Sequence, residues 1–170
     1  MLSIKFHTDS DAEDYSQAIK EYEKIWNSCG EKIFESWERH TGFKFRETYI
    51  NAMVINATSR SFPLTLRADN IVEIKKGTLI HELGHRILAR RIKGRKGKLD
   101  KLSSHKFLDL FLTEVIEDVF GKKMVEITIN FEKTLPPEYA QAWDWALKLT
   151  PEEKKFIFKR VVEGDVTALN

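Results

Sequence analysis

The segment His81-Glu82-Leu83-Gly84-His85 constrains the fold of this chain more than any other. Its two histidines are four residues apart, and on an α-helix such residues lie on one face, about one turn apart. Leu79, Leu83 and Ile87 recur at helical spacing around them. We therefore predict an amphipathic helix from about Gly77 to Arg91, with one face packed and both imidazoles able to reach one metal ion.

The pattern H-E-x-x-H is typical of zinc-dependent metallopeptidases. Two histidines bound to a tetrahedral Zn²⁺ leave room for a third protein ligand and a water molecule. Glu82 lies beside the histidines, where its carboxylate can reach that water and act as general base. We expect Gly84 to leave space beside the metal, at a small cost in helix propensity. The alternative, two surface histidines on an ordinary helix, is less favoured because solubility alone rarely selects this pattern.

The 170 residues suit one domain, which we divide into an N-terminal helical segment (1–42), a sheet with the metal-binding helices (43–121) and a C-terminal strand and helices (122–170). The net charge of +2 gives no bulk attraction to nucleic acid or to an anionic membrane. No apolar run is long enough to span a bilayer, and the N-terminus lacks the apolar core of a signal peptide. We expect a cytoplasmic protein. Cys29, the only cysteine, is interpreted as a partly buried helix residue rather than a reactive thiol or zinc blocker.

Local patterns predict an α+β fold in which a small sheet packs on the motif helix and on a second helix. The first predicted helix is 10–42, which Asp9 or Ser10 could cap and which residues 27–30 could interrupt. The motif helix, 77–91, is followed by a helix that Ser103 or Ser104 caps and that ends near Gly121. Two more helices are predicted at 136–148 and 151–162. The predicted strands are 49–55, 62–67 and 125–131, with 71–74 as a further short strand or as the lead-in to the motif helix. Thr150-Pro151-Glu152-Glu153 has the form of a capping box.

A catalytic zinc site needs a third protein ligand. The candidates on the helix after the motif are His105, Asp109, Glu114, Glu117 and Asp118. A helical wheel places Asp109 and Glu117 on the side expected to be solvated, Asp118 inside the apolar arc and Glu114 on its edge. A carboxylate that faces a core is costly unless it is compensated. Glu114 and Asp118, four residues apart, fit a metal ligand and a partner that orients another ligand.

His81-Glu82-x-x-His85 followed by Glu114-Val-Ile-Glu-Asp118 resembles the gluzincin pattern of thermolysin-like peptidases, and in size the chain looks like the small single-domain gluzincins and the predicted metallopeptidases of microbes and phages. The resemblance covers only these two helices. It implies a zincin-like fold, one zinc per chain, Glu114 as third ligand and Asp118 hydrogen-bonded to His81. Thr113 departs from the family's usual Asn, and no histidine follows His105 to steady an oxyanion.

His105 gives an alternative. An H-E-x-x-H followed by a third histidine resembles the DNA-associated Spartan-like proteases. His105 and Glu114 would lie about 13 Å apart along one helix, so both cannot bind one zinc. Because His105 leaves Asp118 unexplained, Glu114 is favoured and His105 is kept as the alternative ligand.

The expected activity is hydrolysis of a peptide or protein substrate that adds to a sheet edge. That edge would come from Tyr49–Ile55 or from Ser61–Arg67, and the latter is favoured because Pro63 suits an edge strand. Tyr139, in an aromatic C-terminal third, could supply the oxyanion donor. That third could instead cover the cleft and leave a latent or non-catalytic zinc-binding protein. The basic, glycine-rich segment Lys93–Lys98 is interpreted as a solvated loop, with a nucleic-acid contact as the less favoured alternative. No pattern indicates the oligomeric state.

Overall fold

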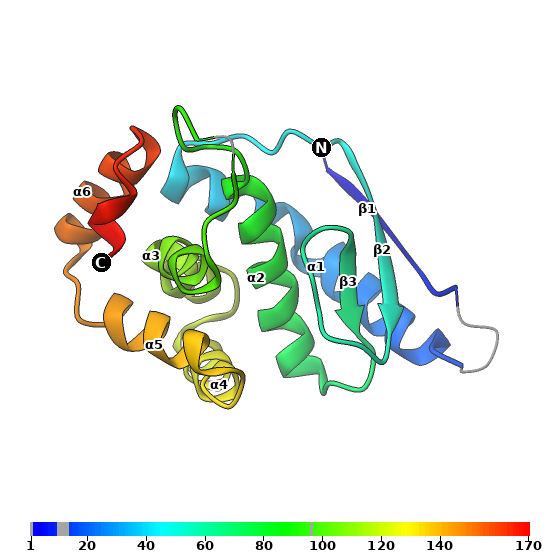
Figure 1. Cartoon of the computed structure of the whole chain (residues 1–170). Coiled ribbons are helices and arrows are strands. Elements are labelled where there is room, and N and C mark those ends of the chain that lie inside the picture. Colours follow the sequence, from blue (N-terminus) through cyan, green and yellow to red (C-terminus); the bar gives the residue numbers. More distant parts are fainter. Residues whose placement is uncertain (1, 10–13, 96) are drawn as a thin grey trace.

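The computed structural model describes residues 2–9, 14–95 and 97–170. In chain order the elements are β1 (Ser3–His7), α1 (Ser16–Thr41), β2 (Tyr49–Ile55), β3 (Leu64–Arg67), α2 (Val72–Leu88), α3 (Lys101–Phe120), α4 (Lys122–Glu132), α5 (Pro137–Ala146), α6 (Pro151–Val162) and the 3₁₀ helix η1 (Val166–Leu169). The predicted α+β class is confirmed, with helices predominating (Figure 1). None of the described helices has the length and apolar character that crossing a membrane requires.

The sheet consists of three parallel strands in the order β1-β2-β3. Helix α1 is the crossover between β1 and β2, as parallel pairing requires. Ile50, Ala52 and Val54 are buried and alternate with more exposed residues of β2, so one face of the sheet packs on the helices. Strand β1 was not predicted, because its alternation is short: Ile4 and Phe6 are its only buried residues.

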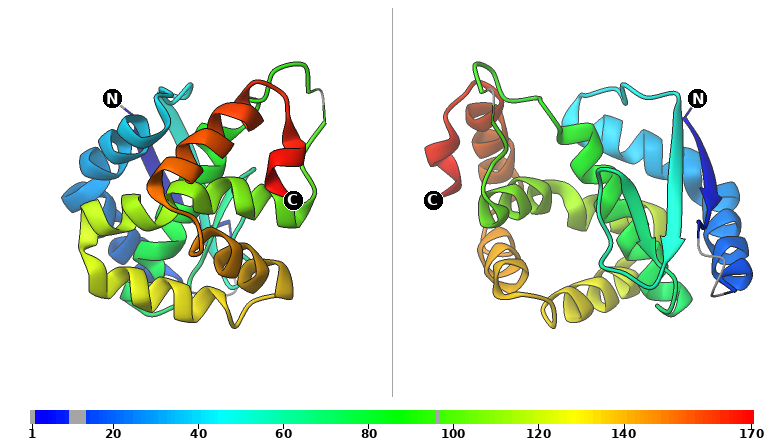
Figure 2. Two further views of the ribbon diagram at one scale, coloured as in Figure 1. Left: turned by 90° about the vertical axis from the view of Figure 1, so that its left-hand side faces the viewer. Right: turned by 45° about the vertical axis from the view of Figure 1, so that its right-hand side comes forward.

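Helix α3 occupies the centre of the helical part. It packs against α1, α2, α4, α5 and α6, whereas α1 and α2 also contact the sheet. The sheet and the C-terminal elements α6 and η1 lie on opposite sides of the molecule, with α2 and α3 between them (Figures 1 and 2). Because α3 has neighbours on most sides, polar residues on several of its faces are enclosed.

Helices α1, α2 and α3 pack tightly together at Gly84. A Cβ atom at this position would lie 2.3 Å from Cζ2 of Trp37 and 2.4 Å from Cδ1 of Leu108. The indole of Trp37 is fully buried and its Nε1 donates to the carbonyl oxygen of Ile80 at 3.2 Å. The space left by Gly84 therefore admits the side chains of two packed helices, and not the metal as the sequence had suggested.

The structure corrects the interpretation of two segments and decides between the alternatives for a third. Residues 125–131 form part of helix α4 and no strand, because the buried residues Met124, Val125, Thr128 and Glu132 follow helical spacing. Helix α1 continues through 27–30 without a break. Gly30 is tolerated there because its missing Cβ makes room for the ring of Trp26. Residues 72–74 are the first turn of α2, so the alternative of a lead-in to the motif helix is confirmed and that of a further strand is wrong.

The helix ends follow capping rules. Thr150 and Glu153 form the predicted capping box of α6, and Gly42 ends α1 in the left-handed conformation. Helix α3 is capped by Asp100, which accepts from Ser103 N, rather than by Ser103 or Ser104. Ser10 lies outside the described residues, and α1 begins only at Ser16. The early start of α3 puts Ser104 and His105 inside its first turns, where they face α2.

Candidate metal centre

Helix α2 positions the H-E-x-x-H residues. Leu79, Ile80 and Leu83 are fully buried and hold the helix against the sheet and α1. His81 and Glu82 are only 3% and 6% exposed, whereas His85 is partly exposed. The rings of His81 and His85 meet edge to face, with centroids 4.8 Å apart. The two imidazoles therefore converge on one enclosed point beside Glu82.

His105 from α3 completes a cluster of three histidines. One ring nitrogen each of His81, His85 and His105 lies within 4.8 Å of the other two, so the cluster could hold a metal ion. His105 is 5% exposed. The structure thus brings together the two motif histidines and the residue that the sequence had kept as the alternative ligand.

Glu114 does not join this cluster, which corrects the favoured sequence interpretation. It follows His105 by nine residues, about half a turn around the helix axis, and so it lies on the other side of α3. There its Oε1 accepts from Nζ of Lys154 on α6 at 2.8 Å. The carboxylate that lay on the edge of the apolar arc is thus paired with a lysine through Oε1, and its Oε2 has no partner among the described residues.

Asp118 does not orient His81, which is a second correction. Its Oδ2 lies 2.6 Å from Oγ of Ser36, 3.0 Å from Arg39 and 2.8 Å from Nε2 of His40. Burial opposes ionisation of this carboxyl, but the hydrogen bonds from Ser36 and His40 outweigh it and lower its pKa. Asp118 therefore joins α3 to α1.

The partner of His81 is Glu132, which the sequence analysis missed. Oε1 of Glu132 lies 2.9 Å from Nδ1 of His81, and its Oε2 accepts from Nε1 of Trp143 at 2.8 Å. Glu132 is the last residue of α4 and is buried. Helical spacing from Thr128 could have indicated its buried position, but the segment had been interpreted as a strand that ends before it.

The Nδ1 atoms of all three histidines face oxygen atoms. A carboxylate oxygen of Glu132 faces Nδ1 of His81, and the carbonyl oxygen of Lys101 lies 2.8 Å from Nδ1 of His105. The hydroxyl oxygen of Ser104 lies 3.5 Å from Nδ1 of His85. A carbonyl or carboxylate oxygen accepts, so the rings of His81 and His105 carry hydrogen on Nδ1 and present Nε2 to the cluster, whereas the hydroxyl of Ser104 can donate to or accept from His85.

The two Nε2 atoms of His81 and His85 are only 3.1 Å apart. This contact is a hydrogen bond when one of the two Nε2 atoms carries a hydrogen, and it leaves both atoms free to bind one metal ion when neither does. Imidazole nitrogens whose second nitrogen is hydrogen-bonded are common metal ligands. The arrangement of donors therefore fits a metal ion.

Burial shapes the charge of each group. It lowers the pKa of His105 to about 4 and, together with the charge of His81, holds that of His85 well below its usual value. For His81, burial also lowers the pKa, but the charge and hydrogen bond of Glu132 outweigh it and raise the pKa to about 9. Burial raises the pKa of the Glu82 carboxyl to about 7. Two of the three imidazoles are thus neutral at pH 7, as metal ligands must be.

Tyr139 of α5 lies over the cluster. Its ring centroid is 4.0 Å from that of His105 and 5.8 Å from that of His81. Lys101 Nζ lies 5.5 Å from the Tyr139 ring centre and 3.3 Å from Glu138, next to Tyr139 in α5. The structure therefore brings the tyrosine proposed from sequence to the histidines.

The sheet edge expected to receive a substrate is already paired. Thr65 of β3 exchanges two backbone hydrogen bonds with Arg60, at 2.9 and 2.8 Å, and the backbone N–H of Arg67 donates to Ser59 Oγ. An extended peptide would have to displace residues 59–60 to add there. The expectation that Ser61–Arg67 offers a free edge is therefore wrong.

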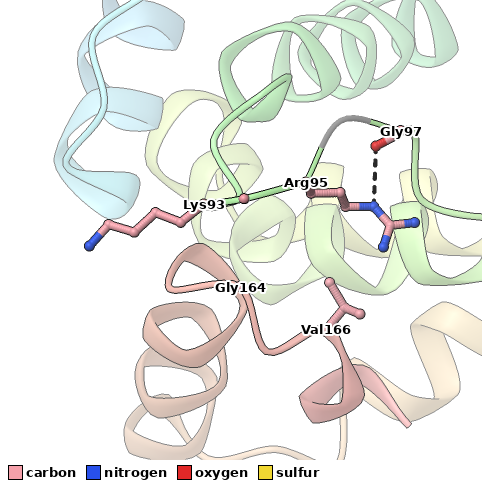
Figure 3. Close-up of a pocket in the computed structure, with 6 residues that line it drawn as sticks. Lys93, Arg95, Gly97, Gly164 and Val166 are labelled. Carbon is pink, nitrogen blue, oxygen red and sulfur yellow. Dashed lines mark hydrogen bonds between the residues drawn. The ribbon is translucent and has the colours of Figure 1, made fainter.

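The basic loop after α2 borders a separate open hollow of about 540 Å³, lined by Lys93, Gly94, Arg95, Gly97, Gly164 and Val166 (Figure 3). The guanidinium of Arg95 donates to the carbonyl oxygens of Gly97 and Lys98, so its donors serve its own loop. The side chain of Lys93 points away from Arg95. The described residues of the loop thus do not converge on an anion, and nucleic-acid contact stays the less favoured prediction.

No protein-family model matches the chain, and no curated protein or solved structure is found to be similar to it. The gluzincin resemblance therefore has no support beyond the motif, and the interpretation of this site depends on its geometry.

Proposed function

We propose that this protein is a zinc-dependent peptide hydrolase. The observation that carries the proposal is the convergence of His81, His85 and His105 beside the buried carboxyl of Glu82. Imidazole nitrogens suit zinc, and three protein ligands are the set that a catalytic zinc site uses, with the fourth position open. A purely structural site would have no use for a base at Glu82.

Zinc bound by the three histidines would polarise the scissile carbonyl and acidify the attacking water. Glu82 is proposed to accept the proton of that water and to pass it to the leaving amine. A general base works best when its pKa lies near the operating pH, and burial brings the pKa of Glu82 to about 7. Glu132 keeps its hydrogen bond to Nδ1 of His81 and so fixes the orientation of that ligand.

Tyr139 is proposed to donate its hydroxyl hydrogen to the oxyanion that forms on the substrate. Support comes from its position against His105 and His81. Tyr139→Phe should then lower kcat by about 10²–10³-fold, the usual cost of one oxyanion donor, with zinc binding retained. Loss of zinc from this variant would instead assign Tyr139 to the metal site.

The competing function is a latent or non-catalytic zinc-binding protein. It is favoured by one observation: Glu82 and two of the histidines are nearly inaccessible, with Tyr139 over the rings. A polypeptide that reaches Glu82 must first displace part of α5. A latent enzyme should cleave short peptides only after α5 is loosened, for example in Trp143→Ala, whereas an active one should cleave them as wild type.

The test begins with metal analysis of the purified protein, which should give about one zinc per chain. His105→Ala should abolish zinc binding, whereas Glu114→Ala should retain it, because Glu114 lies against Lys154. Glu82→Gln should keep zinc and lose peptide cleavage. Zinc loss from Glu114→Ala with retention in His105→Ala would refute the ligand set, and undiminished cleavage by Glu82→Gln would refute the role of the base.

A further inference from the structure

Asp109 of α3 is a buried carboxylate for which the fold provides no partner. Its residue is 1% exposed, and both carboxylate oxygens lack a hydrogen bond to any described residue. The helical wheel had placed it in solvent, but α3 is enclosed by other helices here. An ionised carboxylate removed from water is costly unless a positive charge or hydrogen bonds compensate it. This side chain therefore requires an explanation.

Asp109 lies one turn after His105 on the same face of α3. Helix α3 thus carries a histidine and a carboxylate four residues apart, as α2 carries His81 and His85. Side chains at this spacing point in similar directions, so Asp109 faces the region in which the three histidines meet.

The charged groups around Asp109 come from three other helices. They are Glu132 of α4, His81 of α2 and Lys154 of α6. The amine of Lys154 is hydrogen-bonded to Glu114, and His81 is hydrogen-bonded to Glu132. Burial, and next the charge of Glu132, raise the pKa of Asp109 well above its usual value. Each nearby positive group thus already serves another carboxylate, and Asp109 has none of its own.

A divalent cation among the histidines would supply the missing charge. The imidazole ligands are neutral when they bind a metal, so they leave both positive charges of the ion to be balanced by surrounding carboxylates. Glu82, Asp109 and Glu132 are the three buried acids around the cluster. Glu132 is engaged by His81 and Trp143. Asp109 is the acid among them whose two oxygens have no hydrogen-bond partner among the described residues.

We propose that Asp109 is a fourth protein group of the metal centre, whose carboxylate strengthens the binding of a divalent cation by His81, His85 and His105. Its role is electrostatic positioning of the ion and not chemistry on a substrate. The inference rests on the metal-binding part of the proposed function and is independent of peptide hydrolysis.

The experiment compares Asp109→Asn with Asp118→Asn, which makes the same change on the same helix where Ser36, Arg39 and His40 hold the carboxylate. Zinc affinity is measured by competition with a chromophoric chelator. Asp109→Asn should bind zinc about 10- to 100-fold more weakly than wild type, the usual cost of removing a group that supports a metal ligand set. Asp118→Asn should bind zinc as wild type does.

Thermal unfolding of the same proteins in excess chelator gives the second readout. Without metal, Asp109→Asn should be at least as stable as wild type, because the Asp109 carboxyl has no hydrogen bond that the substitution could remove, whereas Asp118→Asn should be less stable. This opposite order separates a metal-supporting residue from a structural one. Unchanged zinc affinity in Asp109→Asn, or destabilisation of its metal-free form, would overturn the inference.

The outcomes also separate this inference from the proposed activity. If the wild type binds zinc and cleaves nothing, but Asp109→Asn still weakens zinc binding, the inference stands and the hydrolase proposal falls. If the wild type binds no zinc, the metal centre and the role of Asp109 are both refuted.

Discussion

Glu132→Ala tests the construction of the site most directly. Glu132 joins three helices: from α4 it accepts a hydrogen bond from His81 on α2 and another from Trp143 on α5, at 2.9 and 2.8 Å. Both donors are buried, and Trp143 is fully so. Because both lie away from the surface, removal of the carboxylate leaves two buried N–H groups without their acceptor.

The expected magnitude follows from these two bonds. A buried donor left unsatisfied costs about 1–3 kcal/mol, so Glu132→Ala should lower the free energy of unfolding by roughly 2–6 kcal/mol. Loss of the group that orients a ligand histidine should weaken zinc binding about 10- to 100-fold, which corresponds to about 1.4–2.8 kcal/mol. Glu132→Gln keeps one acceptor oxygen. Its free energy of unfolding and its zinc affinity should therefore lie between those of Glu132→Ala and those of wild type.

Urea unfolding and zinc competition measure these two quantities, with Glu126→Ala as the matched control, since Glu126 is an exposed carboxylate on the same helix. Trp143→Phe removes one of the two donors, so the double variant with Glu132→Ala should show a coupling of about 0.5–3 kcal/mol. If Glu132→Ala binds zinc like wild type and is as stable as Glu126→Ala, the role assigned to Glu132 is wrong.

Three further substitutions test the fold around the site. Gly84→Ala should cost about 1–3 kcal/mol in urea unfolding, because its Cβ would lie 2.3 Å from an atom of Trp37, whereas Gly97→Ala, with nothing near, should be neutral. Asp118→Asn should destabilise the protein at pH 7. Since the pKa of Asp118 is lowered below 3.8, its contribution is present above that value and lost as pH falls through the lower folded pKa, so wild type and variant should converge in acid. Thr150→Ala removes the capping box of α6 and should lower the thermal midpoint, at a cost of about 0.5–2 kcal/mol.

The sequence was informative where a single helix determines the geometry. His81 and His85 need only helical spacing to converge, and Thr150 needs only its own first turn to form a cap. The third histidine was ambiguous because its role depends on how α3 is rotated against α2. A helical wheel chooses the rotation by assuming one apolar and one solvated side, and α3 is packed on most of its sides.

That same enclosure explains the misplacement of Asp109, which the wheel put in solvent and the structure buries. Glu132 was not identified as a site residue for a different reason. Val125, Ile127, Ile129 and Phe131 alternate with polar residues, which is typical of a strand, although Ile127 and Ile129 are only half-buried on α4. Helical spacing could have indicated that Glu132 is buried, but not that its partner is a histidine from another part of the chain.

The distribution of these groups indicates that metal binding and the packing of the C-terminal helices are linked. Glu132 and Trp143 connect His81 to α4 and α5, and Tyr139 adds a ring contact to His105. A ligand that binds only the folded site stabilises the elements that form it. Zinc should therefore slow amide hydrogen exchange in α4 and α5 as well as in α2 and α3, and have little effect in β1, which pairs only with β2 at the far side of the sheet. Slowing confined to α2 and α3 would show that the histidines bind metal without the C-terminal helices, and the link through Glu132 would be refuted.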